Sequence, residues 1–280
     1  MTKRRFSVLS GLVLLAFVAG LPLIQACLAK PLSDTTWLDD FTTQDPRWDW
    51  VYHSGSGYHI LQTLTGGITT AELGITTATT HTAYSDSSLH ETSPTITNGV
   101  VAIRLRTNDD NGLTIPGAGT RGWGFFNGKP DPNHPELPEA AWFWSASPES
   151  DATLRGFKAQ VIRGGLVVFN QDLYTTTLKI DMTQWHTYRV ELSDSGTAFF
   201  VDGSRVAATS QRPNSLQRIE FWEDNYAVQL AQPGPGFTTS FLTVSQNQKL
   251  WVDWASFTDL PFTPTPSGPH YFVNLPFLIR

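Results

Sequence analysis

Along residues 185–192 the side chains alternate between apolar and polar. Strict alternation over this length is typical of a β-strand that buries one face. The segment therefore predicts a strand whose buried positions are Tyr188, Val190 and Leu192. Residues 250–257 alternate in the same way and are rich in strand-favouring residues, so they predict a second such strand.

A tight turn separates two further strand patterns within residues 198–206. Asp202-Gly203 stands at its centre, and Asp-Gly readily adopts the positive φ angles that a two-residue hairpin turn requires. Strands are also predicted at residues 37–41, 48–50, 58–61, 100–106, 121–126, 140–146, 154–169 and 219–222. Residues 63–98 are dominated by Thr, Ser and Gly, and we expect edge strands joined by long loops there. No sustained helical period follows the N-terminal segment, so the sequence predicts an all-β protein.

Composition supports a folded chain with a sizeable core. Of the 280 residues, 40% are hydrophobic and only 16% are charged, unlike a disordered chain. The formal net charge is −6, and no basic block follows the N-terminus. Binding to phosphates requires clustered Lys and Arg, so the sequence argues against nucleic acid as a partner.

The N-terminus has the pattern of an export signal. Three basic residues, Lys3-Arg4-Arg5, precede an uncharged apolar stretch at residues 6–24. The apolar stretch is about long enough to cross a bilayer, so an uncleaved membrane anchor is the alternative. Leu21-Pro22 argues against a permanent membrane helix.

Cys27 ends this segment and is the only cysteine of the chain, which excludes an internal disulfide. Residues 24–27 (Ile-Gln-Ala-Cys) resemble a bacterial lipobox, in which such a cysteine carries a lipid; Gln25 departs from that pattern. Ordinary cleavage after Ala26 or Ala29 is the competing interpretation. In either case we expect an exported protein at the cell surface or outside the cell, attached to the membrane only through its signal or lipid anchor.

The order of the predicted strands resembles the concanavalin A-like lectin/glucanase superfamily. The resemblance rests on a Trp-x-x-Tyr strand at residue 185, a Val-Asp-Gly hairpin at residue 201 and a Val-Asp-Trp strand at residue 252, and extends over about residues 37–260. It implies a two-sheet antiparallel jelly-roll sandwich and a role in handling glycans. We expect a signal peptide at 1–29, this jelly-roll domain at 30–260, and a Pro-rich linker with an apolar peptide at 261–280.

Enzymes of this superfamily that resemble family-16 glycoside hydrolases carry Glu-x-Asp-x-Glu or Glu-x-Asp-x-x-Glu on one strand. Glycoside hydrolysis requires two carboxyl groups near one bond. In those enzymes the catalytic strand precedes the Trp-x-x-Tyr segment. The segment in that place here, 140–146, contains no acid and carries Trp142 and Trp144 instead. The resemblance therefore favours a protein that binds a glycan without cleaving it.

One other strand offers acids at a comparable spacing. Glu220, Trp222 and Asp224 share one face of the predicted strand, so Glu220 and Asp224 are the fallback catalytic pair. The segment follows the Val-Asp-Gly hairpin, which is the wrong place in the order for a catalytic strand. In the structural alternative, Glu220 makes a hydrogen bond across the sheet and Asp224-Asn225 caps a turn.

Aromatic side chains are the better indication of a binding site. Aromatic rings pack against the apolar faces of sugars, while polar neighbours bind the hydroxyl groups. The predicted ligand-binding residues are Trp142, Trp144, Trp123, Arg121, Trp222 and Asn225. The alternative is that these tryptophans belong to the core, where large aromatic residues are common.

A structural calcium ion is a further implication of the resemblance. The positions that resemble its ligands are Asp39 or Asp40 near the first strand and Asp253 on the last. Calcium takes six to eight oxygen ligands, so carbonyl groups and water would complete the shell. In the alternative, Asp253 pairs with Lys or Arg, or caps a backbone group.

The sequence thus predicts a protein that binds extracellular or cell-wall polysaccharide and requires no cofactor apart from a possible structural calcium. Two alternatives stay open. One is a glycoside hydrolase or lyase with divergent catalytic residues, and the other is a structural or adhesion module. In that module the aromatic residues would be covered by the Pro-rich loop at 127–139.

Overall fold

The computed structural model describes residues 36–260, apart from 52–55, 93–94, 110–118, 128–138, 164–165, 170–177 and 231–236. The predicted signal, Cys27, the tail at 261–280 and most of the 127–139 loop lie outside the described residues. Among the described residues there is no helix, and hence none that is long and apolar enough to cross a membrane.

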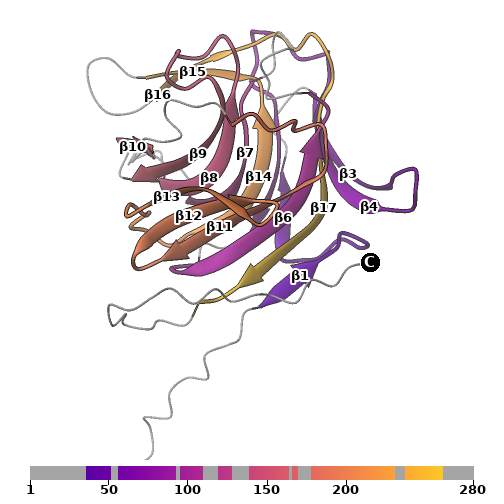
Figure 1. The fold of residues 1–280 in the computed structure, drawn as a ribbon. Helices are drawn as coiled ribbons and strands as arrows, with labels where there is room; N and C mark the ends of the chain where they lie inside the picture. Colours follow the sequence, from indigo (N-terminus) through magenta and orange to yellow (C-terminus); the bar gives the residue numbers. More distant parts are fainter. Residues whose placement is uncertain are drawn as a thin grey trace, which may run out of the picture. The chain divides into compact units, whose positions relative to one another are not determined.

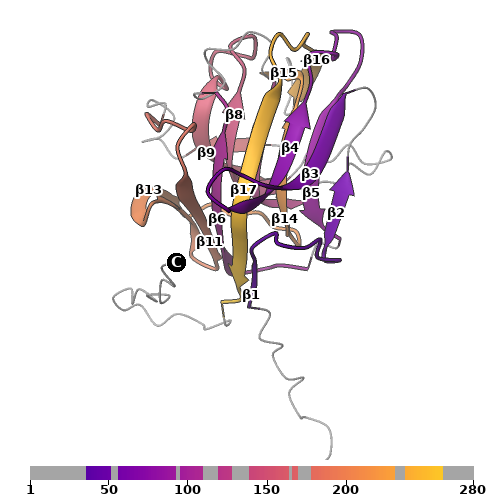
Figure 2. The same cartoon turned by 90° about the vertical axis from the view of Figure 1, so that its right-hand side faces the viewer.

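Two large antiparallel sheets make up most of the domain (Figures 1 and 2). The eight-stranded sheet has the order β13 (Ser204–Thr209), β12 (Gly196–Val201), β11 (His186–Ser193), β6 (Gly99–Thr107), β17 (Gln248–Thr258), β4 (Thr69–Ile75) and β3 (Gly57–Thr63), and β1 (Trp37–Asp39) also pairs with β17.

The seven-stranded sheet has the order β10 (Leu166–Phe169), β9 (Gly156–Arg163), β8 (Glu139–Ala146), β7 (Arg121–Asn127), β14 (Arg218–Asp224), β5 (Asp86–Glu91) and β2 (Trp48–Val51). A separate two-stranded sheet is formed by β15 (Tyr226–Leu230) and β16 (Phe237–Phe241). The prediction of an all-β, two-sheet antiparallel jelly roll is confirmed.

The main core consists of apolar side chains from both large sheets. On β11 the three residues predicted to be buried, Tyr188, Val190 and Leu192, are at most 1% exposed. Trp123 and Phe143 of the seven-stranded sheet extend into the same core, and their rings lie 4.8 and 5.1 Å from that of Tyr188. Burial of a large apolar side chain contributes about 1.5–3 kcal/mol, so this interface is what joins the sheets.

The predicted hairpin is formed by β12 and β13. Its two turn residues, Asp202 and Gly203, have φ angles of 49° and 80°, as the Asp-Gly pair indicated. The Asp202 carboxylate accepts hydrogen bonds from the Thr187 backbone N–H (2.9 Å), and its other oxygen lies 2.6 Å from Nδ1 of His186. These contacts fix the turn against β11.

The expectation of edge strands within residues 63–98 is wrong. β4 lies between β17 and β3, and β5 lies between β14 and β2. On β4 the alternating residues Ala71, Leu73 and Ile75 are fully buried. This apolar alternation indicates a strand with one buried face, but it is short and stands in a region dominated by Thr, Ser and Gly. The glycine of this strand, Gly74, leaves room for the ring of Tyr58 from β3, which an added Cβ would meet at 2.2 Å.

Candidate functional site

The candidate site is the side of the seven-stranded sheet opposite the main core, which we call the outer face. Strand alternation and register bring its side chains into rows across β5, β14, β7, β8 and β9. Its members are Asp86, Ser88, His90, Glu220, Trp222, Asp224, Gly122, Gly124, Phe126, Trp142, Trp144, Lys158 and Gln160. The face combines aromatic and carboxylic side chains.

Three aromatic rings form a connected group on the outer face. The Trp142 and Trp222 centroids are 4.5 Å apart, and Phe126 stacks on Trp142 at 5.0 Å. Nε1 of Trp142 donates to Oε1 of Gln160 at 2.6 Å, which fixes the indole. A Cβ at Gly122 would come within 2.1 Å of the Trp222 ring, so this ring lies over the glycine of the neighbouring strand.

The three tryptophans of the outer face, Trp142, Trp144 and Trp222, differ in how much of their surface is exposed. Trp142 is 6% and Trp144 is 5% exposed, because both belong to a second hydrophobic cluster with Leu154, Ile162 and Val228. Trp222 is only partly buried against that cluster. Trp222 is therefore the tryptophan of the three with ring surface left for a ligand.

Glu220 lies at the other end of the outer-face row on β14, directly opposite His90 of β5 and Gly124 of β7. Its Oε2 accepts a hydrogen bond from Nη2 of Arg218 at 2.9 Å. Burial raises the pKa of Glu220 to about 7, although Arg218 acts in the opposite direction. The carboxyl group is thus an ion-paired acid that titrates near neutral pH.

Asp224 is held by donors on both of its carboxylate oxygens. Oδ1 accepts from the backbone N–H groups of Thr120 and Tyr226 at 2.9 and 2.8 Å, and Oδ2 accepts from the Thr120 hydroxyl at 2.7 Å. Burial nevertheless raises the pKa of Asp224 to about 7, with Asp86 on the neighbouring strand adding to the increase. These bonds fix the chain where β14 ends.

Asn225 has a comparable structural role. Its Oδ1 accepts from the Ser85 backbone N–H at 2.9 Å, and its Nδ2 donates to the carbonyl oxygens of Ala83 and Leu242 at 2.9 and 3.0 Å. Asn225 is fully buried, so its amide is not available to a ligand. Asp224-Asn225 therefore holds the passage from β14 to β15, as the structural alternative proposed.

Arg121 and Trp123 do not lie on the outer face, which corrects the sequence-based grouping. Both point into the main core: Trp123 is fully buried, and Arg121 is 1% exposed. Arg121 forms an ion pair with buried Asp109, and its Nη2 donates to Oε1 of Gln248 at 3.3 Å. The alternation of β7 places Gly122 and Gly124 outward instead, and this parity was readable from the sequence.

A buried acid that was not predicted from the sequence lies beside Arg121. Glu223 is fully buried and lies opposite Arg121 on β7 and Ser87 on β5. Neither carboxylate oxygen of Glu223 has a hydrogen-bond partner among the described residues. Burial raises the pKa of Glu223 to about 8, although the Arg121 charge lowers it. In the sequence, Glu223 follows Ile219 and Phe221 at every second position of β14, and this alternation predicts that Glu223 faces the core.

The residues predicted to bind calcium have protein donors of their own. Asp39 accepts from the Phe41 backbone N–H (2.8 Å) and from Nε1 of Trp48 (2.7 Å), and Asp253 forms an ion pair with Arg104. Asp40 accepts from the Thr42 hydroxyl at 2.8 Å. Among the described residues no group of three or more His, Cys, Asp or Glu side chains is arranged to hold a metal. The calcium site stays a prediction.

Comparisons with known proteins bear on the fold. No known sequence family matches this chain, and no curated protein sequence does. Among solved structures, an endo-acting O-glycanase that members of the human gut microbiota express to initiate mucin breakdown is 14% identical, with a TM-score of 0.53, and the match covers 80% of this chain and 98% of that one.

A β-1,3-1,4-glucanase (lichenase) derived from a mouse hindgut metagenome is also 14% identical, with a TM-score of 0.52, over 81% of this chain and 100% of that one. At this identity the likeness concerns the fold. The chain thus has the two-sheet jelly-roll fold of the concanavalin A-like type that these two solved structures share.

Proposed function

We propose that this protein binds polysaccharide through the outer face, with Trp222 as the ring on which a sugar stacks, and does not cleave it. The observation that carries the proposal is the position of Trp222. Its half-buried indole lies on Gly122, on the same strand face as the carboxyl groups of Glu220 and Asp224. An aromatic surface beside hydrogen-bonding groups is the arrangement of a small-molecule site, in which a few polar groups fix the orientation of the ligand.

The polysaccharide ligand is inferred from the structural neighbours. One of them is an O-glycanase that initiates mucin breakdown, and the other is a β-1,3-1,4-glucanase. Both act on glycan polymers, which supports the same ligand class here. Fold alone does not assign a function, so the inference depends equally on the residues of the outer face.

Binding without cleavage is supported by the state of the two acids. Hydrolysis needs one carboxylic acid and one carboxylate, about 5–9.5 Å apart and free to reach the glycosidic bond. The oxygens of Asp224 accept three hydrogen bonds from Thr120 and Tyr226, and Glu220 is paired with Arg218. Along a strand, residues four apart are separated by about 13 Å. The fallback pair therefore lacks a free nucleophile.

Electrophoresis of the purified chain through native gels that contain single polysaccharides tests this function. We expect slowed migration in at least one gel without loss of the polymer, and restored mobility for Trp222→Ala. The matched control is Trp185→Ala, because Trp185 is also half-buried but contacts Arg104 and Arg106 of the other sheet. A cleared zone around the band would show cleavage, and unchanged mobility in every gel would favour a structural module.

We also infer from the N-terminal segment that the protein is exported and that Cys27 carries a lipid. Metabolic labelling with a radioactive fatty acid tests this inference. We expect label in the wild-type chain and none in Cys27→Ala. Label absent from both, together with cleavage after Ala26 or Ala29 in N-terminal sequencing, would show an ordinary signal peptide.

A further inference from the structure

A band of arginine and tryptophan side chains crosses the eight-stranded sheet on the side turned away from the main core, which we call the arginine face. Arg106 of β6 lies opposite Trp251 of β17, and Arg104 lies opposite Trp254. A β-bulge between Val252 and Trp254 makes both tryptophans point outward although they are three residues apart. Strands β6 and β17 lie side by side within the sheet (Figures 1 and 2). These two arginines and two tryptophans are half-buried, so part of each reaches solvent.

The Arg106 guanidinium is in contact with two indole rings. Its Cζ lies 4.6 Å from the ring centroid of Trp251 and 5.2 Å from that of Trp185, which directly precedes β11. Nε1 of Trp251 donates a hydrogen bond to the Glu72 carboxylate, which fixes this indole. Cation–π contacts with both rings hold the guanidinium in position before any ligand arrives. A group held in this way loses less freedom when it binds.

Arg106 has no counter-ion in the part of the chain that the structure describes. Its Nε is buried without a hydrogen-bond partner. Nη1 and Nη2 make no hydrogen bond with the described residues either, but they are not among the buried atoms, so their N–H groups are open to solvent. Two neighbouring donors at the end of a fixed guanidinium match the oxygens of one carboxylate or sulfate group.

The neighbouring cations of the arginine face already have carboxylate partners. Arg104 forms an ion pair with Asp253, and Nζ of Lys249 lies 2.9 Å from Oε1 of Glu72. Within this described band, Arg106 is therefore the cation whose charge is not balanced. The whole chain has a net charge of −6, so a polyanion gains attraction only from a local contact such as this one.

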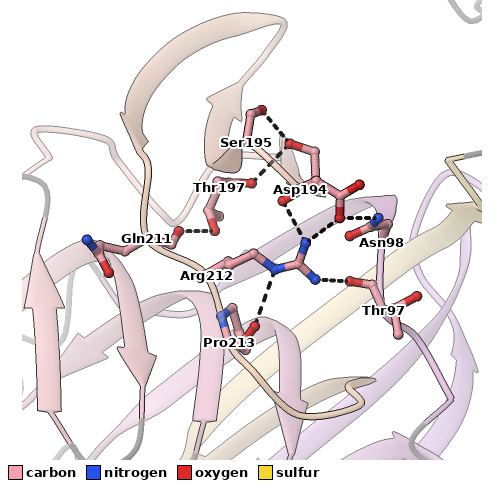
Figure 3. A network of polar contacts seen from close by, with 10 residues as sticks. Thr97, Asn98, Asp194, Ser195, Thr197, Gln211, Arg212 and Pro213 are labelled. Carbon is pink, nitrogen blue, oxygen red and sulfur yellow. Dashed lines mark hydrogen bonds and ion pairs between the residues drawn. The ribbon is translucent and has the colours of Figure 1, made fainter. Parts of the chain in front are cut away.

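Arg212 illustrates the different surroundings of an arginine that holds the structure together. Its Nη1 donates to the Ser193 carbonyl oxygen at 2.9 Å and to Oδ1 of Asp194 at 3.0 Å, and its Nη2 donates to the Thr97 carbonyl oxygen at 2.8 Å (Figure 3). Arg212 thus joins three chain segments, and Asp194 balances its charge. Arg106 has no bond of either kind among the described residues, so these structural roles do not account for its charge.

The groups on the arginine face favour an acidic sugar as the ligand. A guanidinium with free N–H groups attracts an anion and repels a cation, and a neutral sugar would leave it unpaired. Trp251 and Trp254 add ring surface against which the apolar face of a sugar can pack. Nucleic acid requires several clustered cations, whereas the described band offers one unbalanced cation.

We propose that the arginine face binds an acidic polysaccharide. Nη1 and Nη2 of Arg106 donate to the carboxylate or sulfate group of one sugar residue, and the indoles of Trp251 and Trp254 pack against the sugar rings beside it. This site goes beyond the proposed function, because it lies on the other sheet and shares no residue with the outer face. The two sites could then bind different polymers or different parts of one polymer.

Biolayer interferometry with the full chain and immobilised polymers tests the proposal. Polygalacturonate against its methyl ester tests a carboxylate, and dextran sulfate against dextran tests a sulfate. We expect at least one acidic polymer to bind at least about tenfold more tightly than its neutral match. Polyglutamate has carboxylates without sugar rings and should bind at least about tenfold more weakly than that polymer. Equal binding within both pairs, or equal binding of polyglutamate, would overturn the proposal.

Variants of Arg106 locate the binding. Arg106→Met removes the charge but keeps an apolar side chain against the indoles, and should weaken binding of the acidic polymer about tenfold. Arg106→Lys keeps the charge without the paired donors, and should weaken it about threefold. Thermal unfolding checks that both variants are folded.

The matched control is Arg205→Met. Arg205 is an exposed arginine on the same face, on the edge strand β13, and its loss should change binding by less than about twofold. Equal losses for Arg106→Met and Arg205→Met would show general electrostatic attraction and contradict a site at Arg106. Wild-type binding by Arg106→Met would contradict it as well.

Two comparisons distinguish the arginine face from the outer face. Trp222→Ala should leave the difference between each acidic polymer and its neutral match unchanged. Arg106→Met should leave retardation by neutral polysaccharides unchanged, because they lack the group that Arg106 binds. For the same reason, gels of neutral polysaccharide are the ones in which Trp185→Ala is the control for Trp222→Ala. Failure of one site therefore leaves the test of the other intact.

Discussion

Glu223 and Asp224 are neighbours on β14, are both buried and both have raised pKa values, yet they differ in what surrounds them. Asp224 faces outward and receives three hydrogen bonds from Thr120 and Tyr226. Glu223 faces the main core, and its oxygens have no partner among the described residues. The contribution of a buried carboxyl group to stability therefore depends on the hydrogen-bond donors around it and not on burial alone.

The same lesson applies to the two faces of the seven-stranded sheet. Trp123 on the core face and Trp142 on the outer face are 0% and 6% exposed, so each face has an apolar cluster of its own. Trp222 differs from both because its ring rests on Gly122 at the margin of the outer cluster. The stability of the fold should thus depend mainly on Trp123 and Trp142, and the binding of polysaccharide on Trp222.

The largest effect is expected from the buried tryptophans. Trp142→Ala and Trp123→Ala should each lower the free energy of unfolding by about 3–5 kcal/mol, because each leaves a cavity in a packed cluster. Trp222→Ala should lower it by only about 1–2 kcal/mol, since less of its surface is buried. Urea denaturation followed by tryptophan fluorescence measures all three. Equal losses for Trp142→Ala and Trp222→Ala would remove the distinction between them.

Asp224→Ala is expected to cost about 2–3 kcal/mol, because it leaves the backbone N–H groups of Thr120 and Tyr226 without an acceptor. Thermal unfolding of this variant against Asp49→Ala, an exposed aspartate on β2, measures the difference. If both variants unfold at the same temperature, Asp224 does not hold the end of β14.

Glu223→Gln should stabilise the protein by about 1–2 kcal/mol at pH 8 and have little effect at pH 5. The ordinary pKa of this carboxyl group is 4.5, and in the folded protein it is about 8, so the folded state binds more protons between these values. The free energy of unfolding then decreases as the pH rises through this range. Glu220 and Asp224 act in the same direction, each with a pKa of about 7, so the slope should become shallower without vanishing.

Denaturation curves at half-unit intervals from pH 4.5 to 8.5 measure this dependence. The Asp224→Asn variant provides the comparison, because it removes a titrating group that has donors. A wild-type stability that increases over this range would contradict the assignment of a protonated Glu223.

The smallest effect on stability is expected from Gly122→Ala, below about 1 kcal/mol, since alanine is slightly better than glycine within a strand. The added methyl group would meet the Trp222 ring at 2.1 Å, so the ring has to move away from β7. We therefore expect weaker retardation by polysaccharide at nearly unchanged stability. Retardation equal to that of the wild type would show that the resting place of this ring is unimportant.

The strands were predictable because their alternation records which side is buried, as at Tyr188, Val190 and Leu192. The hairpin was predictable because Asp202-Gly203 adopts φ angles that few other pairs adopt. Both signals depend on residues that are close in sequence.

The site was less predictable, because alternation tells on which face a residue lies but not what covers that face. Trp142 and Trp144 share the outer face as expected, but Leu154 and Val228, which pack with them, come from the link between β8 and β9 and from β15. Arg121 and Trp123 were grouped with the outer-face residues although they alternate with Gly122 and Gly124, which are the positions that face outward.

The position of β17 in the eight-stranded sheet has a consequence for how the protein folds. This strand is the last described along the chain, yet it lies between β6 and β4 and pairs with both, and with β1 as well. Until residues 248–258 are available, the sheet has two open edges in its centre. Pairings between such distant segments form slowly, and exposed edges promote aggregation. Folding of this domain should therefore begin elsewhere and finish with the insertion of β17.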